Sequence, residues 1–372
     1  MESCEVLIVG GGPAGSTCAA GLVAAGLDVL LLDRAVFPRS KPCAGWITPA
    51  VSRTLAIDPG EYAQGRVLQA ISGFRTSMIG GPEVVTRYDQ VVSYGIRRDE
   101  FDHYLLERSK VRRQLGEGVT RLERQDNGWL VNERIKARLL VGAGGHFCPV
   151  ARTLGARVSQ ETVVIARVTE EVLSPEQMQH CRTAADTPAL FFSPDLQGYG
   201  WLIRKGNRLN VGLGRRGQAD FGRYFEEFRA FLAVRGELPA GFAGHFQGHA
   251  YRLYDRHEAH RYVDEGVLLI GDAAGLAGVH SGEGILPAIQ SGQLAAETIV
   301  AARGDYRRTC LEPYVGLLAN RCGERLHLPA FSLPSGLVHR LGAYLLATPW
   351  STRHLILNRW FLHADRPGHL SG

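Results

Sequence analysis

The sequence has little lysine, and its positive charge is spread thinly. Lysine occurs only at positions 41, 110, 136 and 205, so nearly all of the 42 basic residues are arginine. The formal net charge of +5 is small for 372 residues, and no run of basic residues follows the chain. This disfavours a nucleic-acid-binding protein, although a mild positive charge suits acidic ligands such as phosphates.

Paired cysteines are also missing. The seven cysteines lie far apart, and no two have the spacing of a zinc site or of a redox Cys-x-x-Cys pair. Neither a disulfide framework nor a metal site is therefore expected, and a reducing, cytoplasmic location fits. His257 and His260 have a spacing that could seat a metal, but no third ligand is evident.

No segment is typical of a secretion signal or of a membrane span. Glu2 and Glu5 are acidic where a signal peptide would be basic, and no apolar run reaches about 18 residues. The tail over 331–370 alternates apolar residues with Arg340, Arg353 and Arg359. We interpret it as a helical pair covering the second domain, with peripheral contact to a membrane surface as the alternative.

The first forty residues have the pattern of a nucleotide-binding fold. Residues 6–9 predict a buried parallel strand, 16–26 a helix, and 28–33 a second strand that ends at Asp33. Between strand and helix, Gly10 permits a tight turn, Gly12 lets a pyrophosphate approach the backbone, and Gly15 lets the helix pack closely. The helix N-terminus offers N–H groups to phosphates, and Asp33 is placed to accept hydrogen bonds from a ribose.

A second glycine-rich segment lies nearer the C-terminus. Residues 267–270 predict a strand, Gly271 and Asp272 a turn, and 286–302 a helix that follows a loop containing Gly282 and Gly284. Asp272 can accept from a ribityl or ribose hydroxyl, and the loop places N–H groups near a second electron-rich end of a ligand. One ligand contacted by both segments suits FAD, with adenosine on the first and flavin on the second.

These motifs resemble the FAD-dependent geranylgeranyl reductase family, within the p-hydroxybenzoate hydroxylase-like flavoproteins. The matching segments are 10–15 with Asp33-Arg34, Lys-Pro-Cys-Ala-Gly at 41–45, Arg-x-x-Phe-Asp at 98–102, Gly-Asp-Ala-Ala-Gly at 271–275, Gly-Glu-Gly-Ile at 282–285, and the strand pair over 199–214. The resemblance covers about residues 4 to 303. The segments at 41–45 and 282–285 and the Trp201 region point most narrowly to the reductases.

The predicted fold is α/β, with a Rossmann-like FAD-binding domain, an antiparallel-sheet substrate domain and a helical C-terminal tail. The FAD-binding domain is expected to be discontinuous, over 1–65, 95–155 and 262–305. The substrate domain would take 66–94 and 156–261, and the C-terminal helical region 306–372. Within the substrate domain, residues 205–208 predict a hairpin turn and 221–234 a helix packed on the sheet.

The resemblance also implies which residues contact FAD. They are Gly10, Gly12, Pro13, Ala14, Gly15, Asp33, Arg34, Cys43, Ala44, Gly45, Arg98, Val119, Gly271, Asp272, Gly282, Gly284 and Ile285. Arg98 would lie near the phosphates. Cys43, in the loop that the family places beside the flavin, and His280 are the candidate catalytic residues, since either could donate a proton. Packing against the flavin ring for Cys43, and a surface position for His280, are the alternatives.

Three positions depart from the wider superfamily. Gly144 stands where an aspartate often follows the central strand, Val279 and His280 where a proline is common, and Ala44 where a second glycine is expected. The electron donor therefore stays open between NADPH, bound without a motif of its own, and a reduced ferredoxin. Oligomeric state is open as well.

The leading prediction is an FAD-dependent oxidoreductase that reduces carbon–carbon double bonds of an isoprenoid or similar apolar substrate. One alternative is an FAD-dependent monooxygenase or halogenase-like enzyme acting on an aromatic or polyketide. A halogenase is disfavoured, because residues 201–204 only faintly match the Trp-x-Trp-x-Ile-Pro motif. The other alternative is a flavin-bearing protein that binds a lipid without turning it over.

Overall fold

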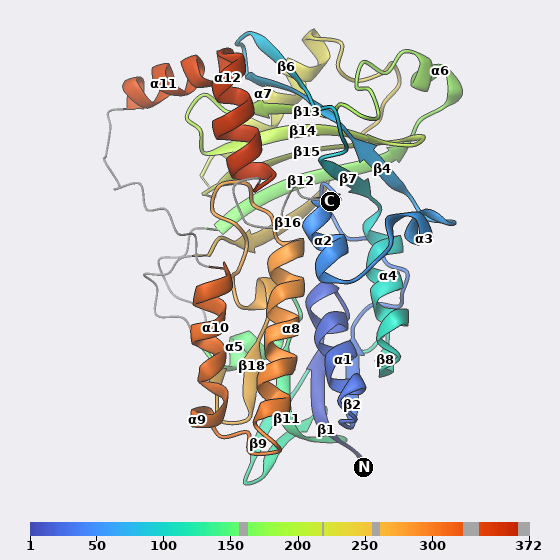
Figure 1. Cartoon of the computed structure of the whole chain (residues 1–372), viewed down its shortest axis with the longest axis vertical. Coiled ribbons are helices and arrows are strands. Elements are labelled where there is room, and N and C mark those ends of the chain that lie inside the picture. Colours follow the sequence, from blue (N-terminus) through green and yellow to red (C-terminus); the bar gives the residue numbers. More distant parts are fainter. Residues whose placement is uncertain (156–162, 218, 255–260, 323–334, 364–372) are drawn as a thin grey trace. The chain divides into compact units, whose positions relative to one another are not determined.

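The computed structural model describes residues 1–155, 163–217, 219–254, 261–322 and 335–363 (Figure 1). By their internal contacts the residues form two compact units. Unit 1 contains Met1–Ser40, Arg98–Thr162 and Tyr251–Arg325, and unit 2 contains Lys41–Arg97, Val163–Ala250 and Leu326–Gly372. Each unit has a sheet of its own, and each is described here by itself.

Unit 1 is built on a parallel sheet. Its strands in spatial order are β8 (Arg112–Leu115), β2 (Val29–Asp33), β1 (Glu2–Val9), β11 (Ile135–Gly142) and β18 (Val267–Leu269), and each is parallel to its neighbour. This is the 3-2-1-4-5 order of a Rossmann-type fold. Val6, Leu7 and Ile8 are fully buried, as expected of a strand covered on both faces. Antiparallel strands extend the sheet: β9 (Leu122–Gln125), β10 (Gly128–Val131) and β17 (Val263–Asp264).

Three helices pack together in unit 1: α1 (Pro13–Ala24), α4 (Arg98–Ser109) and α8 (Ile285–Ala301) (Figure 1). Small residues bring α1 and α8 close, since a Cβ added to Gly292 would lie 2.5 Å from the carbonyl oxygen of Ala14. The buried hydroxyl of Tyr314 donates to the carbonyl oxygen of Leu269 at 2.9 Å, which ties α10 to β18. The other helices of this unit are α5 (Pro149–Thr153), the 3-10 helix η1 (Gly271–Ala273), α9 (Arg308–Leu311) and α10 (Pro313–Cys322).

Unit 2 is built on a seven-stranded, mostly antiparallel sheet. Its strands in order are β16 (Gln247–Arg252), β12 (Val163–Val172), β15 (Arg208–Arg216), β14 (Gly198–Lys205), β13 (Ala189–Phe192), β5 (Gly73–Met78) and β6 (Glu83–Arg87), and β13 and β5 run parallel. A small antiparallel sheet contains β3 (Trp46–Ile47), β7 (Ser93–Ile96) and β4 (Leu68–Ile71). The short helices are α2 (Pro49–Thr54), α3 (Pro59–Ala63) and α6 (Pro175–Gln179).

The two faces of the large sheet carry separate apolar cores. Side chains alternate along each strand, so Phe191 packs with helix α7 (Phe221–Val234), whereas Leu190 and Phe192 pack on the opposite face. That opposite face is covered by the tail helices α11 (Ser335–Ala347) and α12 (Pro349–Ser351) and the π-helix η2 (Thr352–Phe361). Figure 1 shows these tail helices together at the end of the chain.

The predicted fold class is confirmed, with a parallel Rossmann-like sheet and an antiparallel one. Residues 221–234 form α7 and a two-residue turn joins β14 to β15, both as expected. Helix α1 begins at Pro13 rather than at Ser16, because proline is well suited to a first helical turn.

The compact units divide the chain differently from the expected domains. Residues 41–65, expected with FAD binding, fall in unit 2, where β3 pairs with β7. The expected C-terminal region, 306–372, is split, because α9 and α10 pack in unit 1 and the later helices in unit 2. In the part of the chain that the structure describes, no helix is both long enough and apolar enough to cross a membrane.

The tail helices are expected to be part of the core of unit 2. Phe361 is 4% exposed, so Phe361→Ala should lower the free energy of unfolding of this unit by about 3–5 kcal/mol, measured by urea denaturation. The control is Leu341→Ala in α11, at a side chain that is 48% exposed. It should change the free energy of unfolding by less than about 0.5 kcal/mol. Equal effects of the two substitutions would contradict this assignment.

Candidate functional site

The glycine-rich turn after β1 is held by close backbone contacts. Gly10 has a φ of +117°, and a Cβ there would lie 2.4 Å from the carbonyl oxygen of Ala143. A Cβ on Gly15 would lie 1.9 Å from the carbonyl oxygen of Gly10. At Gly12, by contrast, the nearest atom is Nη2 of Arg39, at 3.5 Å. Because residue 12 has no side chain, there is open space beside the first N–H groups of α1.

Asp33 is fixed beside this turn by backbone donors. Its Oδ2 accepts from the N–H of Gly11 at 2.7 Å, and its Oδ1 accepts from the N–H of Ala35 at 2.8 Å. Each carboxylate oxygen has a second lone pair that can accept from a ribose hydroxyl. Arg34 is exposed next to it, and Val119 is half-buried against the core of unit 1.

Two arginines share one buried carboxylate close to the turn. Arg98 binds Asp102 through two hydrogen bonds of 2.9 Å, and Nη2 of Arg39 lies 3.2 Å from the same carboxylate, which is fully buried. Two cations and one anion leave a net positive charge next to Gly12, which suits a pyrophosphate. Arg98 was predicted, but Arg39 was missed, because only the fold brings it from its loop to the glycine turn.

The second glycine segment lies against the first within unit 1. Gly271 has a φ of +60°, and a Cβ there would lie 2.9 Å from Cβ of Ala14. The N–H of Gly271 donates to the hydroxyl of Ser291 at 3.0 Å, which fixes the end of β18 to α8. A Cβ on Gly284 would lie 3.3 Å from Oδ1 of Asp272, so this carboxylate lies over the start of α8.

The residues of unit 1 fit the adenosine, pyrophosphate and ribityl parts of FAD. Gly12 leaves space for a phosphate, Arg39 supplies charge, and Asp33 and Asp272 supply acceptors. Gly282 lies in the loop between η1, which contains Asp272, and α8, and Pro13 and Ile285 begin the helices α1 and α8. His280 lies exposed on that loop.

The predicted Cys43 loop belongs to unit 2. The Cys43 thiol is half-buried and accepts from the N–H of Gly45 at 3.3 Å. Gly45 has a φ of +60°, and its carbonyl oxygen accepts from the N–H of Ile96 in β7 at 2.7 Å. Burial raises the pKa of Cys18 and of Cys4 to about 12, which keeps those thiols protonated and unreactive.

Beside this loop unit 2 has an apolar core rich in aromatic rings, between its sheet and the tail helices. We name it the aromatic cluster: Trp46, Phe74, Phe192, Tyr199, Trp201 and Phe361. The ring of Phe361 lies 5.4 Å from that of Trp46 and 5.2 Å from that of Tyr199, centroid to centroid. Ala44 packs against the same core, so the loop borders the cluster.

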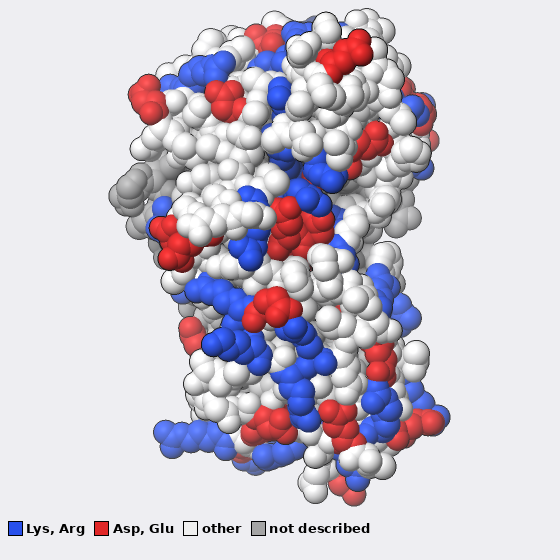
Figure 2. All heavy atoms as spheres, turned by 90° about the vertical axis from the view of Figure 1, so that its right-hand side faces the viewer, with Lys and Arg blue, Asp and Glu red and all other residues white. Residues whose placement is uncertain are grey.

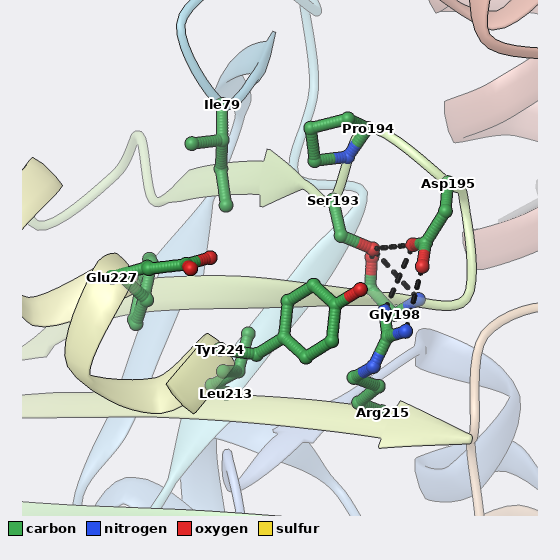
Figure 3. A pocket seen from close by; sticks show the side chains of 10 residues that line it. Ile79, Ser193, Pro194, Asp195, Gly198, Leu213, Arg215, Tyr224 and Glu227 are labelled. Atoms are coloured by element: carbon green, nitrogen blue, oxygen red, sulfur yellow. Dashed lines mark hydrogen bonds and ion pairs between the residues drawn. The ribbon is translucent and has the colours of Figure 1, made fainter. Parts of the chain in front are cut away.

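Unit 2 also contains a pocket of about 160 Å³ on the side of its sheet that α7 covers (Figure 3). Burial alone would raise the pKa of Asp195, but hydrogen bonds from Arg215, Gln197 and Ser193 outweigh it and lower the pKa to about 2. Arg215 stacks on Tyr224, with 3.6 Å from its Cζ to the ring centroid. None of the predicted site residues lines this pocket, and its Asp195 and Arg215 pair with each other.

No metal site accompanies these features in the described ranges, where no group of three histidine, cysteine or acidic side chains is placed to hold an ion. His257 and His260 lie outside the described residues. The candidate functional features among the described residues are therefore the glycine segments of unit 1 and the loop and aromatic cluster of unit 2.

Comparison with known proteins agrees with this description. The FAD binding domain model matches residues 3–55. A menaquinone reductase of Mycobacterium tuberculosis (strain ATCC 25618 / H37Rv) is 32% identical over 356 residues, with 87% of this chain and 81% of the relative covered. A digeranylgeranylglycerophospholipid reductase 1 of Methanothermobacter thermautotrophicus is 26% identical, with 83% and 82% covered. A solved geranylgeranyl bacteriochlorophyll reductase-like protein from Thermoplasma acidophilum has the same fold, with a TM-score of 0.76 at 19% identity and 98% of each chain covered.

The glycine segments and the FAD-domain match define an FAD-dependent oxidoreductase. Within that class, the chain belongs to the geranylgeranyl reductase family. The predicted family, cofactor and enzyme class are thus confirmed.

The open space at Gly12 leads to a test of FAD binding. Gly12→Ala should weaken FAD binding about tenfold or more, because the methyl group fits the free protein but occupies the path of the pyrophosphate. Affinity is measured by flavin fluorescence quenching, and the stability of the FAD-free protein by thermal unfolding. Gly222→Ala in α7, which has open space around it, is the control and should change neither value. Unchanged affinity at position 12 would contradict the assignment.

Proposed function

We propose that this protein saturates carbon–carbon double bonds in an isoprenoid chain, with FAD held by unit 1. The relatives named above are reductases of menaquinone and of digeranylgeranyl lipid by their names. The aromatic cluster of unit 2 is the structural observation that carries the proposal. It is an apolar, aromatic-rich core bordered by the loop that contains Cys43, and we place the isoprenoid chain next to it.

The aromatic cluster also offers one polar contact. The indole N–H of Trp46 is buried and has no hydrogen-bond partner among the described residues. An unsatisfied buried donor costs stability unless a ligand accepts from it. We therefore expect the substrate to carry an oxygen atom near its isoprenoid portion, as a quinone or an ether lipid does.

Reduced FAD supplies the hydride that the double bond needs. The second carbon of the bond also needs a proton, and the chain offers two candidate donors. The Cys43 thiol is half-buried and hydrogen-bonded within its loop, while His280 lies exposed on the loop before α8. We favour Cys43, because its loop borders the aromatic cluster, next to which we place the substrate.

The electrons come from NADPH or from a reduced ferredoxin. In Figure 2 basic side chains lie among acidic ones on the face shown, and Arg112 pairs with both Glu2 and Asp28. The charge on this face therefore gives no reason to prefer an acidic protein donor over a nucleotide.

A single-turnover experiment tests the function without knowledge of the donor. The FAD-loaded protein is reduced anaerobically with dithionite, any excess is removed, and menaquinone or a geranylgeranyl lipid is added. We expect the flavin absorbance to return as the isoprenoid chain gains two hydrogen atoms, measured by mass spectrometry after any quinol has been reoxidised in air. Cys43→Ser should slow this step about tenfold or more, while His280→Gln should not.

Two results would contradict the proposal. One is reduced flavin that is reoxidised only when oxygen is admitted, which would indicate a monooxygenase. The other is flavin that stays reduced with every isoprenoid while the substrate binds, which would indicate a flavin protein without turnover. Dithionite-reduced free FAD with each substrate is the control for uncatalysed reduction.

We further propose that the tail touches the membrane from which the substrate is drawn. Leu337, Leu341 and Tyr344 lie on one face of α11 and are 50%, 48% and 67% exposed, and Trp350 is 63% exposed. Arg340 is exposed beside them, and residues 326–364 contain no aspartate or glutamate. Exposed aromatic and aliphatic residues with basic neighbours favour an anionic lipid surface.

Vesicle sedimentation tests this contact. The protein should bind phosphatidylcholine vesicles that contain phosphatidylglycerol more strongly than pure phosphatidylcholine vesicles. The double substitution Leu341→Gln, Tyr344→Gln should weaken binding about tenfold. Val234→Gln in α7, at a side chain that is 89% exposed, is the control and should bind normally. Protein that stays in the supernatant with both vesicle types would contradict the proposal.

A further inference from the structure

Unit 2 contains an ion pair with a buried lysine and a partly exposed glutamate, which stability alone does not explain. Nζ of Lys205 lies 2.5 Å from Oε2 of Glu170, and the lysine side chain is 1% exposed. Removing a lysine from water is costly, and a buried ion pair is often no more stabilising than apolar residues of the same size. The contacts of the Lys205–Glu170 pair indicate its role in the structure.

Asn210 links this pair to two parts of the candidate site. Its Nδ2 donates to Oε2 of Glu170 at 2.8 Å and to the carbonyl oxygen of Cys43 at 2.9 Å. Its Oδ1 accepts from the indole Nε1 of Trp201 at 2.8 Å. Because Trp201 can only donate, and Glu170 and the Cys43 carbonyl can only accept, one orientation of the amide satisfies all three partners.

Lys205 restrains the same loop from another direction. A Cβ on Gly45 would lie 2.5 Å from Nζ of Lys205 and 2.3 Å from the carbonyl oxygen of Ile96. The lysine therefore packs directly on Gly45, two residues after the carbonyl that Asn210 holds. Asn210, Lys205 and β7 together leave the loop little freedom to move.

We propose that Asn210, oriented by the Lys205–Glu170 pair, is a positioning residue that fixes the Cys43 loop relative to Trp201 of the aromatic cluster. The inference rests on the proposed function, in which Cys43 donates a proton to a substrate bound next to that cluster. A displacement of about 1 Å at a catalytic group can cost about a hundredfold in rate. Loss of Asn210 should therefore lower kcat and leave KM largely unchanged.

The experiment uses the full-length protein with Cys181, Cys310 and Cys322 changed to serine, so that Cys43 is the reactive thiol. Asn210→Asp keeps the size and the acceptor for Trp201, but it replaces the donor to Cys43 by a carboxylate oxygen. Asn210→Leu removes all three bonds. Asn358→Leu is the matched control, because that amide accepts from the Tyr88 hydroxyl at 2.7 Å in the same unit and makes no described bond to the loop.

Two measurements need no substrate. Hydrogen exchange of the backbone amides of residues 41–47 should be about tenfold faster or more in both Asn210 variants. The rate of Cys43 alkylation by iodoacetamide, followed from pH 6 to 9, should change about threefold or more. Thermal unfolding and FAD affinity show whether a variant is folded. If Asn210→Leu does not fold, the isosteric Asn210→Asp variant alone tests whether Asn210 holds the loop.

The third measurement is steady-state reduction of the isoprenoid substrate. We expect kcat to fall about tenfold or more and KM to change less than about threefold in the Asn210 variants, with the control unchanged. Folded variants with normal exchange, alkylation and kcat would overturn the inference. If the proposed function is wrong, the parent protein shows no turnover, while exchange and alkylation still decide whether Asn210 holds the loop.

Discussion

Unit 1 depends on the contact between the backbone of its first strand and the first turn of its first helix. Gly15 packs directly on the carbonyl oxygen of Gly10, and Gly10 packs on that of Ala143 at the end of β11. Any side chain at position 10 or 15 would separate these segments. The contact also places the N-terminus of α1 at the carboxyl end of the sheet, where Rossmann-type folds bind their ligands. Gly271 packs against Ala14 of α1, and this contact brings the second glycine segment to the same edge of the sheet.

Unit 2 depends on a different constraint, the alternation of side chains along its strands. Consecutive residues of β13 serve opposite cores, so a shift of one residue would exchange Phe191 with Phe192. Glycines leave space for the large rings: a Cβ on Gly200 would lie 2.2 Å from the Phe228 ring, and one on Gly212 would lie 2.2 Å from the Trp201 ring. The ring of Trp201 is thus fixed by packing as well as by its bond to Asn210.

The sequence allowed the local features to be predicted and left the long-range ones open. The turn at 10–15, Asp33, the hairpin at 205–208 and the helix at 221–234 have signals within a few residues, and the structure contains them. Arg39 and Asn210 have no such signal, since each acts through partners distant in sequence. For Lys205 the sequence predicts only a place in a hairpin turn. Nothing in its neighbours indicates that its ammonium is buried against Gly45.

The hydrogen bonds of Asn210 and the packing of the aromatic cluster have complementary roles in unit 2. Apolar packing holds the rings through their shape and without directed partners, whereas a hydrogen-bonded amide with three partners has one arrangement. In the proposed function the aromatic cluster lies next to an apolar chain, and the amide holds the loop that carries the thiol. Trp201 takes part in both, through its ring and its indole N–H. Unit 2 therefore combines an apolar, aromatic core with a hydrogen-bonded attachment for the loop beside it.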